Sequence, residues 1–320
     1  MLALLRNSLA YVGKHAAPAY AISILLGLAL PQLASALRPA IPISIFIFIV
    51  LAFARANLPA LQALGKRPAR IGAGLVLSTL VPPAIAWLFL ASPFAATLDP
   101  GIRLGIALMA AAPPLMASSA FVLVIGLENS FALAMLVLGM LIAPLVSPGL
   151  ASALVGSEVP ISPWALAEKL AIFIGGGMAC GLVIRRLAGI ERITARKQEL
   201  DGSGVFLYFF FAIAAMDGVI DATLSAPGLV FGMLALSTGL TAAAFFVTYG
   251  LSRGFGFNDG FSSAVIAGFR NMGLLMAPIF SVVPQSTFLY FALAQIPIYI
   301  APILLKALKL WLEPKPAAAE

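Results

Sequence analysis

The feature that most constrains the fold is a succession of apolar segments, each long enough to cross a lipid bilayer. A helix of about 20 apolar residues spans the hydrocarbon layer. Segments of this length follow one another along most of the chain, and short polar turns such as Leu127-Glu128-Asn129 separate several of them. Only 10% of the 320 residues are charged and the mean hydropathy is +1.07, whereas soluble domains carry about 25% charged residues. We therefore predict an all-α polytopic membrane protein that forms a single membrane domain over residues 1–320.

The apolar pattern predicts ten transmembrane helices. They form two sets of five, and one longer polar connection, from Arg185 to Asp201, lies near the middle of the chain. Because an odd number of spans inverts the second half relative to the first, we predict two inverted five-helix repeats, over about residues 18–154 and 163–310. The predicted spans cover about residues 18–36, 41–60, 71–92, 103–126, 130–154, 163–186, 204–224, 228–252, 261–282 and 287–310.

The basic residues predict the orientation of these spans. If the N-terminus lies inside, most of the 19 lysines and arginines also lie inside, as the positive-inside rule requires. We therefore predict an integral protein of the inner or plasma membrane with both termini cytoplasmic. The net charge of +7 is assigned to these loop residues, so we expect the bilayer rather than a nucleic acid as partner.

Several function classes are excluded by what the chain lacks. It has one cysteine, Cys180, and one histidine, His15, so neither a disulfide framework nor a histidine metal cluster can form. We find no paired nucleophile and base, no phosphate loop and no metal-ligand spacing. We therefore expect no enzyme activity and no cofactor, with a role for sodium left open.

Two predicted spans carry signals of an interrupted helix. In the ninth, Arg270 lies between Gly268 and Gly273 inside an apolar stretch, where an arginine at a helix centre costs roughly 2.5–3.5 kcal/mol. In the fourth, the signal is Ala112-Pro113-Pro114, followed by Ser118-Ser119. Each is the fourth span of its repeat. Broken helices in matching positions of two repeats indicate a transport site, which we predict near the bilayer midplane.

The polar residues at these breaks are candidate substrate-binding residues. The guanidinium of Arg270 is a planar fork of donors suited to a carboxylate or sulfonate. Its alternative role is an internal ion pair with Asp217, Asp221 or Glu128. We expect the small polar residues beside it to form hydrogen bonds to a substrate. Their alternative role is hydrogen bonding between helices. The candidate substrate-binding set is Arg270, Asn271, Ser118, Ser119, Pro113 and Gly268.

Asp217 is a candidate for proton coupling, because an intramembrane carboxylate can relay protons. It lies in the seventh predicted span, and Asp221 follows one helical turn later, so we expect the two to share a face. The alternative role of Asp217 is a charge that caps the outer end of the helix.

Four segments together resemble the bile acid:sodium symporter family. Ala112-Pro113-Pro114-Leu115-Met116-Ala117-Ser118-Ser119 is similar to its fourth-helix crossing motif, and Gly268-Phe269-Arg270-Asn271-Met272-Gly273 is similar to its Glu-x-Gly-x-Gln-Asn-x-Gly. Pro83-Ala84-Ile85-Ala86-Trp87 resembles its third-helix motif, and Ala143-Pro144-Leu145-Val146-Ser147-Pro148 its fifth-helix ending. The resemblance runs over about residues 18–310. It implies a ten-helix secondary transporter with a panel domain, a core domain and broken helices 4 and 9 that cross in the core.

The chain departs from this family at the positions that the resemblance assigns to sodium. Ile266 replaces a glutamate, and Arg270 replaces a glutamine. Ser119 stands at an asparagine position, and Ser78 at a glutamine position on the third helix. Two hydroxyl positions on the fifth helix are Ala132 and Leu136. We therefore treat Ser78, Ser118, Ser119 and Ile266 as a degenerate sodium site.

These observations predict a secondary active transporter of a small or amphipathic organic anion that works by alternating access without sodium. Two alternatives stay open. One is a sodium-coupled anion symporter with a non-standard sodium site. The other is a passive anion facilitator or channel.

Overall fold

The computed structural model describes residues 16–55, 68–156 and 162–313. Within these ranges the chain is helical, and extended pairing is limited to one isolated bridge between Pro114 and Arg270. Seven of the described helices are long and apolar enough to cross a membrane, so the chain is an integral membrane protein. They are Pro31–Ala54, Pro68–Leu90, Ser130–Val155, Pro163–Ala188, Lys197–Ser225, Pro227–Leu251 and Gln285–Leu312.

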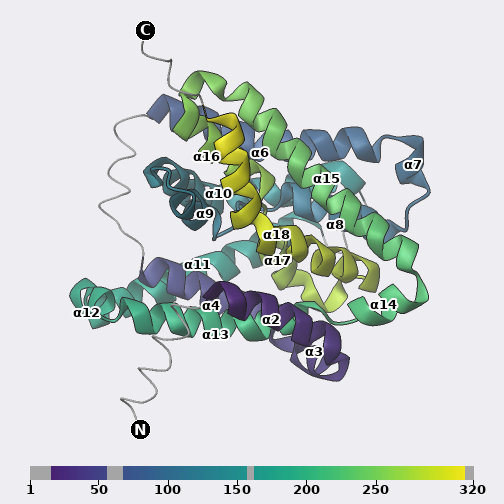
Figure 1. Ribbon diagram of the computed structural model, residues 1–320, viewed down its shortest axis with the longest axis horizontal. Helices are drawn as coiled ribbons and strands as arrows, with labels where there is room; N and C mark the ends of the chain where they lie inside the picture. The colour runs from purple at the N-terminus through teal and green to yellow at the C-terminus, as the bar shows by residue number, and fades with distance from the viewer. Residues whose placement is uncertain (1–15, 56–67, 157–161, 314–320) are drawn as a thin grey trace.

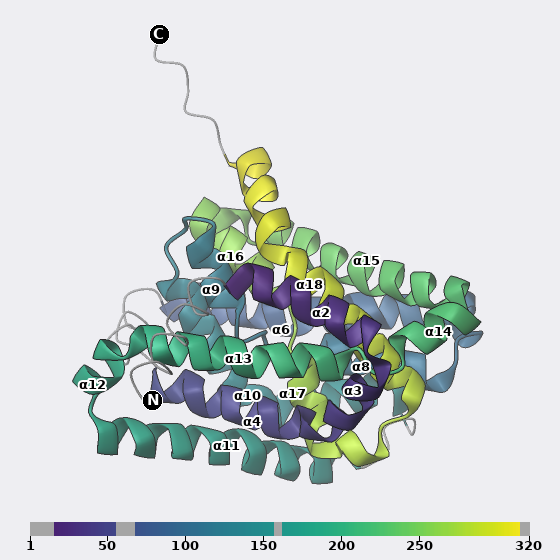
Figure 2. The same ribbon diagram turned by 60° about the horizontal axis from the view of Figure 1, so that its bottom comes forward.

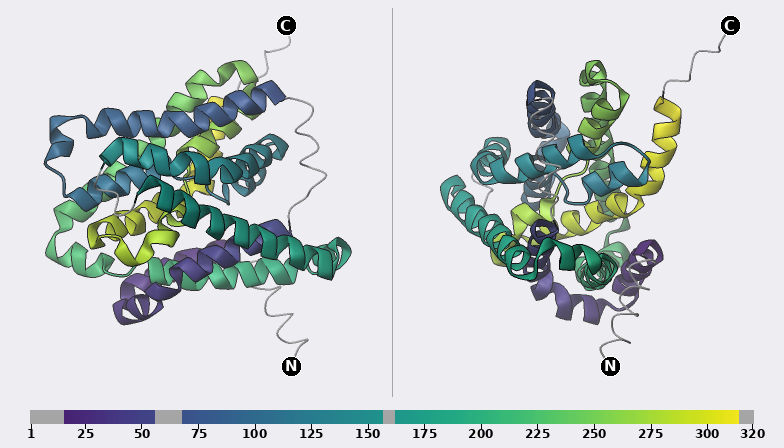
Figure 3. Two further views of the ribbon diagram at one scale, coloured as in Figure 1. Left: turned by 180° about the vertical axis from the view of Figure 1, so that it is seen from behind. Right: turned by 90° about the vertical axis from the view of Figure 1, so that its left-hand side faces the viewer.

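The helices form two layers, which Figure 1 shows one above the other and Figure 3 shows from behind. The lower layer contains α2 (Ala16–Ala29), α3 (Pro31–Leu37), α4 (Ile41–Ala54), α11 (Pro163–Ala188) and α13 (Lys197–Ala215). The upper layer contains α6 (Pro68–Leu90), α8 (Pro100–Ala111), α9 (Ser118–Val124), α10 (Ser130–Val155), α15 (Pro227–Leu251), α16 (Phe257–Gly268) and α18 (Gln285–Leu312). Figure 2 shows α18 against α15 on one side and α2 and α13 on the other. Short segments complete the set: η1 (Arg38–Ala40), α7 (Pro93–Ala96), α12 (Ile190–Ala195), α14 (Val219–Ser225), η4 (Arg253–Phe255), α17 (Met272–Met276) and η5 (Ala277–Val282).

Glycines let the lower helices approach closely. A Cβ added at Gly181 of α11 would lie 2.6 Å from the carbonyl oxygen of Val50 in α4. One added at Gly177 would lie 2.8 Å from Ile49 Cγ2. Exclusion from water does not drive helices together inside a membrane. Small residues favour helix association there because they let two backbones approach closely.

Most predicted spans coincide with a helix, and the differences have local causes. The first span is two helices, because the chain turns at Leu30 before Pro31. The seventh is also two, because Gly218 adopts a left-handed conformation (φ 75°) between α13 and α14. The polar connection predicted from Arg185 to Asp201 is itself largely helical. Residues 56–60 of the second span and both chain termini lie outside the described residues.

The fourth and ninth predicted spans are interrupted where the sequence predicts. The first break, residues 112–117, separates α8 from α9, and the second, residues 269–271, separates α16 from α17. No piece of these two interrupted helices has the length of a membrane span, although Pro100–Ala111 and Met272–Val282 are apolar. The described helices therefore include seven full-length spans, and the count of ten depends on how the interrupted segments are assigned.

Polar contacts tie the upper layer together at both of its ends. At one end, Ser286 Oγ donates to Asp99 Oδ1 at 2.5 Å and Thr287 Oγ1 donates to the carbonyl oxygen of Gly101 at 2.6 Å. These bonds join the start of α18 to the start of α8. At the other end, Asn258 in the first turn of α16 accepts from the N–H of Glu128 at 2.9 Å and donates to its carbonyl oxygen at 3.0 Å.

Candidate functional site

The two breaks lie side by side and are hydrogen-bonded to each other. The N–H of Leu115 donates to the carbonyl oxygen of Phe269 at 2.9 Å, and the N–H of Asn271 donates to that of Pro113 at 2.8 Å. Breaking a helix exposes amides and carbonyls that have no partner inside an apolar interior. Each break therefore satisfies groups that the other exposes.

Proline is compatible with this pairing because of its register. Pro114 lies opposite Arg270 in an antiparallel bridge, and the two hydrogen bonds come from the residues on either side of this pair. Residues at such a non-hydrogen-bonded position contribute no N–H to the pairing. Pro114 has no N–H to contribute, so its sequence position breaks the helix without weakening the bridge.

Glycines bring neighbouring helices against the breaks. A Cβ at Gly139 of α10 would lie 2.8 Å from Cδ and Cγ of the Pro114 ring. A Cβ at Gly268 would lie 3.2 Å from the carbonyl oxygen of Thr241 and 3.2 Å from Phe245 Cβ, both in α15. Gly268, a predicted site residue, is thus needed for close packing at the end of α16.

Arg270 is buried with 4% of its surface exposed. Its Nη1 donates to the carbonyl oxygen of Ser78 in α6 at 2.8 Å, and its Nε has no hydrogen-bond partner. Within the described ranges, no carboxylate lies at ion-pair distance from the guanidinium.

The predicted alternative of an internal ion pair is therefore wrong for all three of its named partners. Asp217 pairs with Arg38, and the carboxylate of Glu128 accepts from the N–H of Ser130 at 2.6 Å. Asp221 is exposed on α14.

The other predicted binding residues border the same crossing. Asn271 caps α17, because its Oδ1 accepts from the N–H of Leu274 at 3.1 Å. Ser118 and Ser119 open α9 just after the first break. The Ser118 hydroxyl is buried and unpartnered, and Ser119 is half-buried. Pro113 contributes its carbonyl oxygen to the pairing of the two breaks.

Asp217 lies apart from Arg270, in a polar contact between the two layers. Arg38 Nη1 donates to Asp217 Oδ2 at 2.9 Å and to Gln285 Oε1 at 2.7 Å. The guanidinium also lies over the ring of Phe288, 4.0 Å from its centroid. The expectation that Asp217 and Asp221 share a helical face is wrong, because the left-handed Gly218 ends the helix between them.

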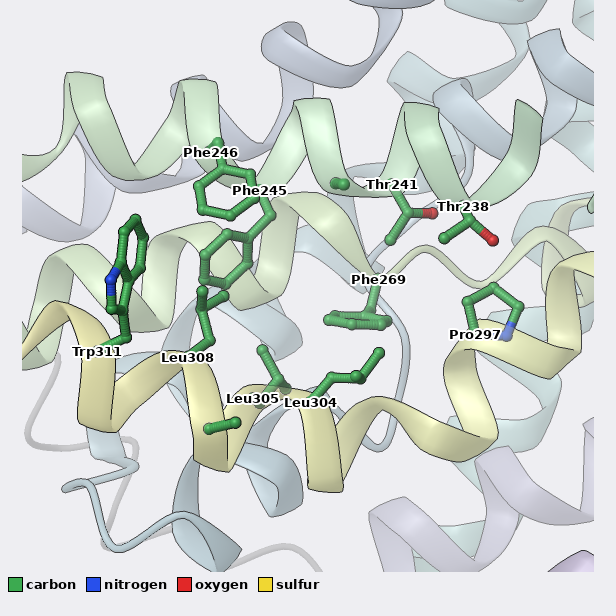
Figure 4. Close-up of a pocket in the computed structure, with 12 residues that line it drawn as sticks. Thr238, Thr241, Phe245, Phe246, Phe269, Pro297, Leu304, Leu305, Leu308 and Trp311 are labelled. Carbon is green, nitrogen blue, oxygen red and sulfur yellow. The ribbon is translucent and has the colours of Figure 1, made fainter. Parts of the chain in front are cut away.

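An apolar cavity of about 410 Å³ adjoins the second break. Figure 4 shows α15 and α18 on its two sides, with Phe269 of the break projecting between them. Apart from Thr238 and Thr241, its lining is apolar. This cavity therefore offers volume to an apolar group but no charge.

Some notable residues give no sequence signal. Thr241 and Tyr290 are buried polar residues inside long apolar helices, where nothing in the spacing distinguishes them from packing residues. Asp259, in the first turn of α16, is 3% exposed and lies 3.6 Å from Arg70 of α6. Asp259 follows a polar turn, where a carboxylate gives no sequence signal of burial.

The sequence profile of the Sodium Bile acid symporter family matches residues 42–225. The chain belongs to this family. The match covers more than half of this bile acid symporter homologue, including Ser78 and the first break, whereas Arg270 and the second break lie beyond it. Family membership identifies the chain as a membrane transporter of the symporter class. No curated protein matches the chain.

In this symporter-family chain, two of the positions that the resemblance assigns to sodium have packing or hydrogen-bonding roles within the fold. Ile266 is fully buried among apolar residues. Ser78 uses its hydroxyl within its own helix, as a donor to the carbonyl oxygen of Leu75 at 3.1 Å, and its carbonyl accepts from Arg270. The guanidinium of Arg270, a fixed cation, thus lies against Ser78, one of these positions.

Proposed function

We propose that this protein is a secondary active transporter that moves a small or amphipathic organic anion by alternating access. The observation that carries the proposal is Arg270, which is a buried cation at the junction of two paired helix breaks. Because no carboxylate of the described chain neutralises it, an anionic ligand there is electrostatically favoured.

The proposed architecture has ten membrane spans in one transport domain over residues 1–320, arranged as two inverted repeats. The lower layer is the panel domain and the upper layer is the core, in which the broken helices cross near the bilayer midplane. The contacts at the two ends of the core support this proposal. Asp99 and Ser286 join two helix starts at one end, and Asn258 and Glu128 join the corresponding starts at the other. Both termini are proposed to be cytoplasmic, in the inner or plasma membrane.

The proposed anion contacts are centred on Arg270. Asn271 adds the amide nitrogen of a side chain whose oxygen caps α17, and Ser118 adds an unpartnered hydroxyl. Ser119 completes the polar set, and Pro113 and Gly268 shape the backbone around it. The apolar cavity beside Phe269 accommodates the hydrophobic part of an amphipathic substrate.

We propose that this transport is independent of sodium. Ile266 offers no ligand, and Arg270 repels a neighbouring cation by about 4 kcal/mol at 4 Å and an effective dielectric of about 20. The guanidinium instead joins the broken helix to α6 through Ser78. The driving force would then be the substrate gradient, exchange or protons. For protons, Asp217 is the candidate carrier, and its pair with Arg38 must open.

A sodium-coupled symporter with a non-standard site is the second candidate. The observation that favours it is the Ser118 hydroxyl, which is buried and without a partner beside the first break. Neighbouring carbonyls would have to supply most of the remaining oxygen ligands.

Uptake into liposomes tests the proposal. Organic anions that raise the unfolding temperature of the purified protein identify the substrate, and its uptake is then measured with sodium replaced by potassium or choline at constant pH. We expect unchanged uptake. A steep, saturable loss without sodium would support the symporter alternative, and flux without counterflow would support a channel.

A further inference from the structure

Three residues that line one small cavity in the upper layer each carry a buried polar atom without a hydrogen-bond partner. The atoms are Nε of Arg270, Oγ1 of Thr241 in α15 and Oη of Tyr290 in α18. The three residues are 4%, 8% and 0% exposed. The remaining lining is apolar and comes from α6, α8, α15 and the end of α16. Three elements far apart in the chain thus each contribute a residue with an unused polar atom to the lining of this cavity.

The chemistry of these groups favours an anion over water or a cation. A neutral molecule would satisfy the two hydroxyls but would leave the guanidinium without a counter-charge. Buried charges in proteins are paired or hydrogen-bonded because desolvation disfavours isolated ones. All three groups can donate a hydrogen bond. The lining contains no carboxylate, so its electrostatic potential is positive.

The cavity also sets the size of its ligand. Its volume is about 20 Å³, and a cavity of this size holds about one water-sized molecule. The Tyr290 ring lies close against α8, because a Cβ at Gly105 would lie 2.9 Å from its Cδ1.

We propose that Arg270, Thr241 and Tyr290 form a binding site for one compact monovalent anion inside the core. The ligand is either a free halide or the carboxylate end of the transported molecule, which share charge and size. The proposal rests on the assignment of an anion to Arg270 made above, but it does not require that the protein transport anything.

Thermal unfolding of the purified full chain in detergent tests this proposal. Chloride, bromide or formate is titrated against gluconate, which is too large for the cavity, at constant potassium concentration and ionic strength. A bound anion raises the unfolding temperature with the logarithm of its concentration above its dissociation constant. A response to halide identifies a free inorganic ion, and a response to formate alone identifies the carboxylate end of an organic ligand.

Isosteric variants separate this site from general salt effects. Tyr290→Phe and Thr241→Val each remove one hydroxyl and should weaken anion binding about tenfold or more, since hydrogen bonds to charged groups are the strong ones. Arg270→Gln should abolish the response. The matched control is Thr248→Val on the same helix, whose buried hydroxyl is also unpartnered but lies outside the cavity lining; its response should equal that of the unmodified chain.

Equal unfolding temperatures in chloride, bromide, formate and gluconate would overturn the proposal, as would a response that Tyr290→Phe and Thr241→Val leave intact. An anomalous bromide peak between the three side chains in a crystal would confirm the location. These results are independent of flux. A protein that binds the anion without carrying any organic substrate would retain this site and lose the proposed function.

Discussion

Arg270 and Ser78 are joined by a 2.8 Å hydrogen bond from the guanidinium Nη1 to a main-chain carbonyl oxygen. The bond connects the second helix break to α6, 192 residues away in sequence. Because its acceptor is a main-chain atom, the bond depends on the position of α6 and not on the side chain at residue 78.

Arg270 variants should separate charge from geometry. Arg270→Lys keeps the charge but loses the fork of donors, so we expect weaker anion binding and reduced uptake. Arg270→Gln removes the charge, and uptake of an identified anion should fall more than tenfold. Ser78→Ala is the matched control, since it leaves the carbonyl acceptor in place, and it should transport nearly as the unmodified protein does. Normal uptake by Arg270→Gln would contradict the proposed role.

Restoring the family's ligands should create a response to sodium. We expect the double variant Ile266→Glu/Arg270→Gln to unfold at a higher temperature in sodium than in potassium at equal ionic strength. At a sodium concentration 100 times the dissociation constant, the stabilisation would be about 2.7 kcal/mol. In Ile266→Glu alone, Arg270 should pair with the new carboxylate and suppress this response. Equal unfolding temperatures of the double variant in both salts would argue against the degenerate-site assignment.

Gly139→Ala should disturb the paired breaks. The added Cβ would lie 2.8 Å from two atoms of the rigid Pro114 ring, and overpacking of this kind typically costs about 1–3 kcal/mol. We expect a lower unfolding temperature and slower transport. Gly149→Ala, on the same helix, would meet nothing within 4 Å, and its higher helix propensity should leave stability unchanged or raised by up to about 1 kcal/mol. If the two variants behave alike, the close approach of α10 is not important for stability.

Asp217→Asn should loosen the end of α13, because it weakens the pair between Asp217 and Arg38 of η1. The change removes the charge that Arg38 contacts while keeping the side-chain shape. We expect faster maleimide labelling of a Val219→Cys reporter placed in a Cys180→Ser background. Val219 follows the left-handed turn at Gly218 and is only 4% exposed, so its labelling rate reports how often this turn opens. Asp221→Asn, at an exposed position one turn away, is the control and should label at the parent rate. Labelling that is equally slow in both variants would show that the Arg38–Asp217 pair does not hold the turn after α13 in place.

The helical character of the chain and both helix breaks could be predicted from the sequence, whereas most side-chain contacts around the breaks could not. Pro113-Pro114 and the Gly268–Gly273 stretch predict two helix breaks, because proline and glycine destabilise a helix locally. Arg270 is conspicuous because a charge in an apolar segment is costly. Its contact with Ser78 could not be predicted, because the acceptor is a main-chain oxygen and does not depend on which side chain is present.

The polar residues that line the small cavity together with Arg270 could not be predicted. Tyr290 and Thr241 sit in apolar helices whose sequences look alike on buried and lipid-facing sides, so only the packing of α15 against α18 brings them to Arg270. The pairing of Asp217 with Arg38 depends on the left-handed turn at Gly218. The hydropathy of the seventh segment is continuous, which is why a single helix is expected there.

The bridge between Pro114 and Arg270 is built from main-chain atoms alone, and this has an evolutionary consequence. Side chains at 119, 266 and 270 can be exchanged without removing a hydrogen bond of the bridge. A lineage can therefore inherit the crossing intact while point mutations change which ion, if any, drives it. In such a lineage the fold stays the same and the coupling ion varies.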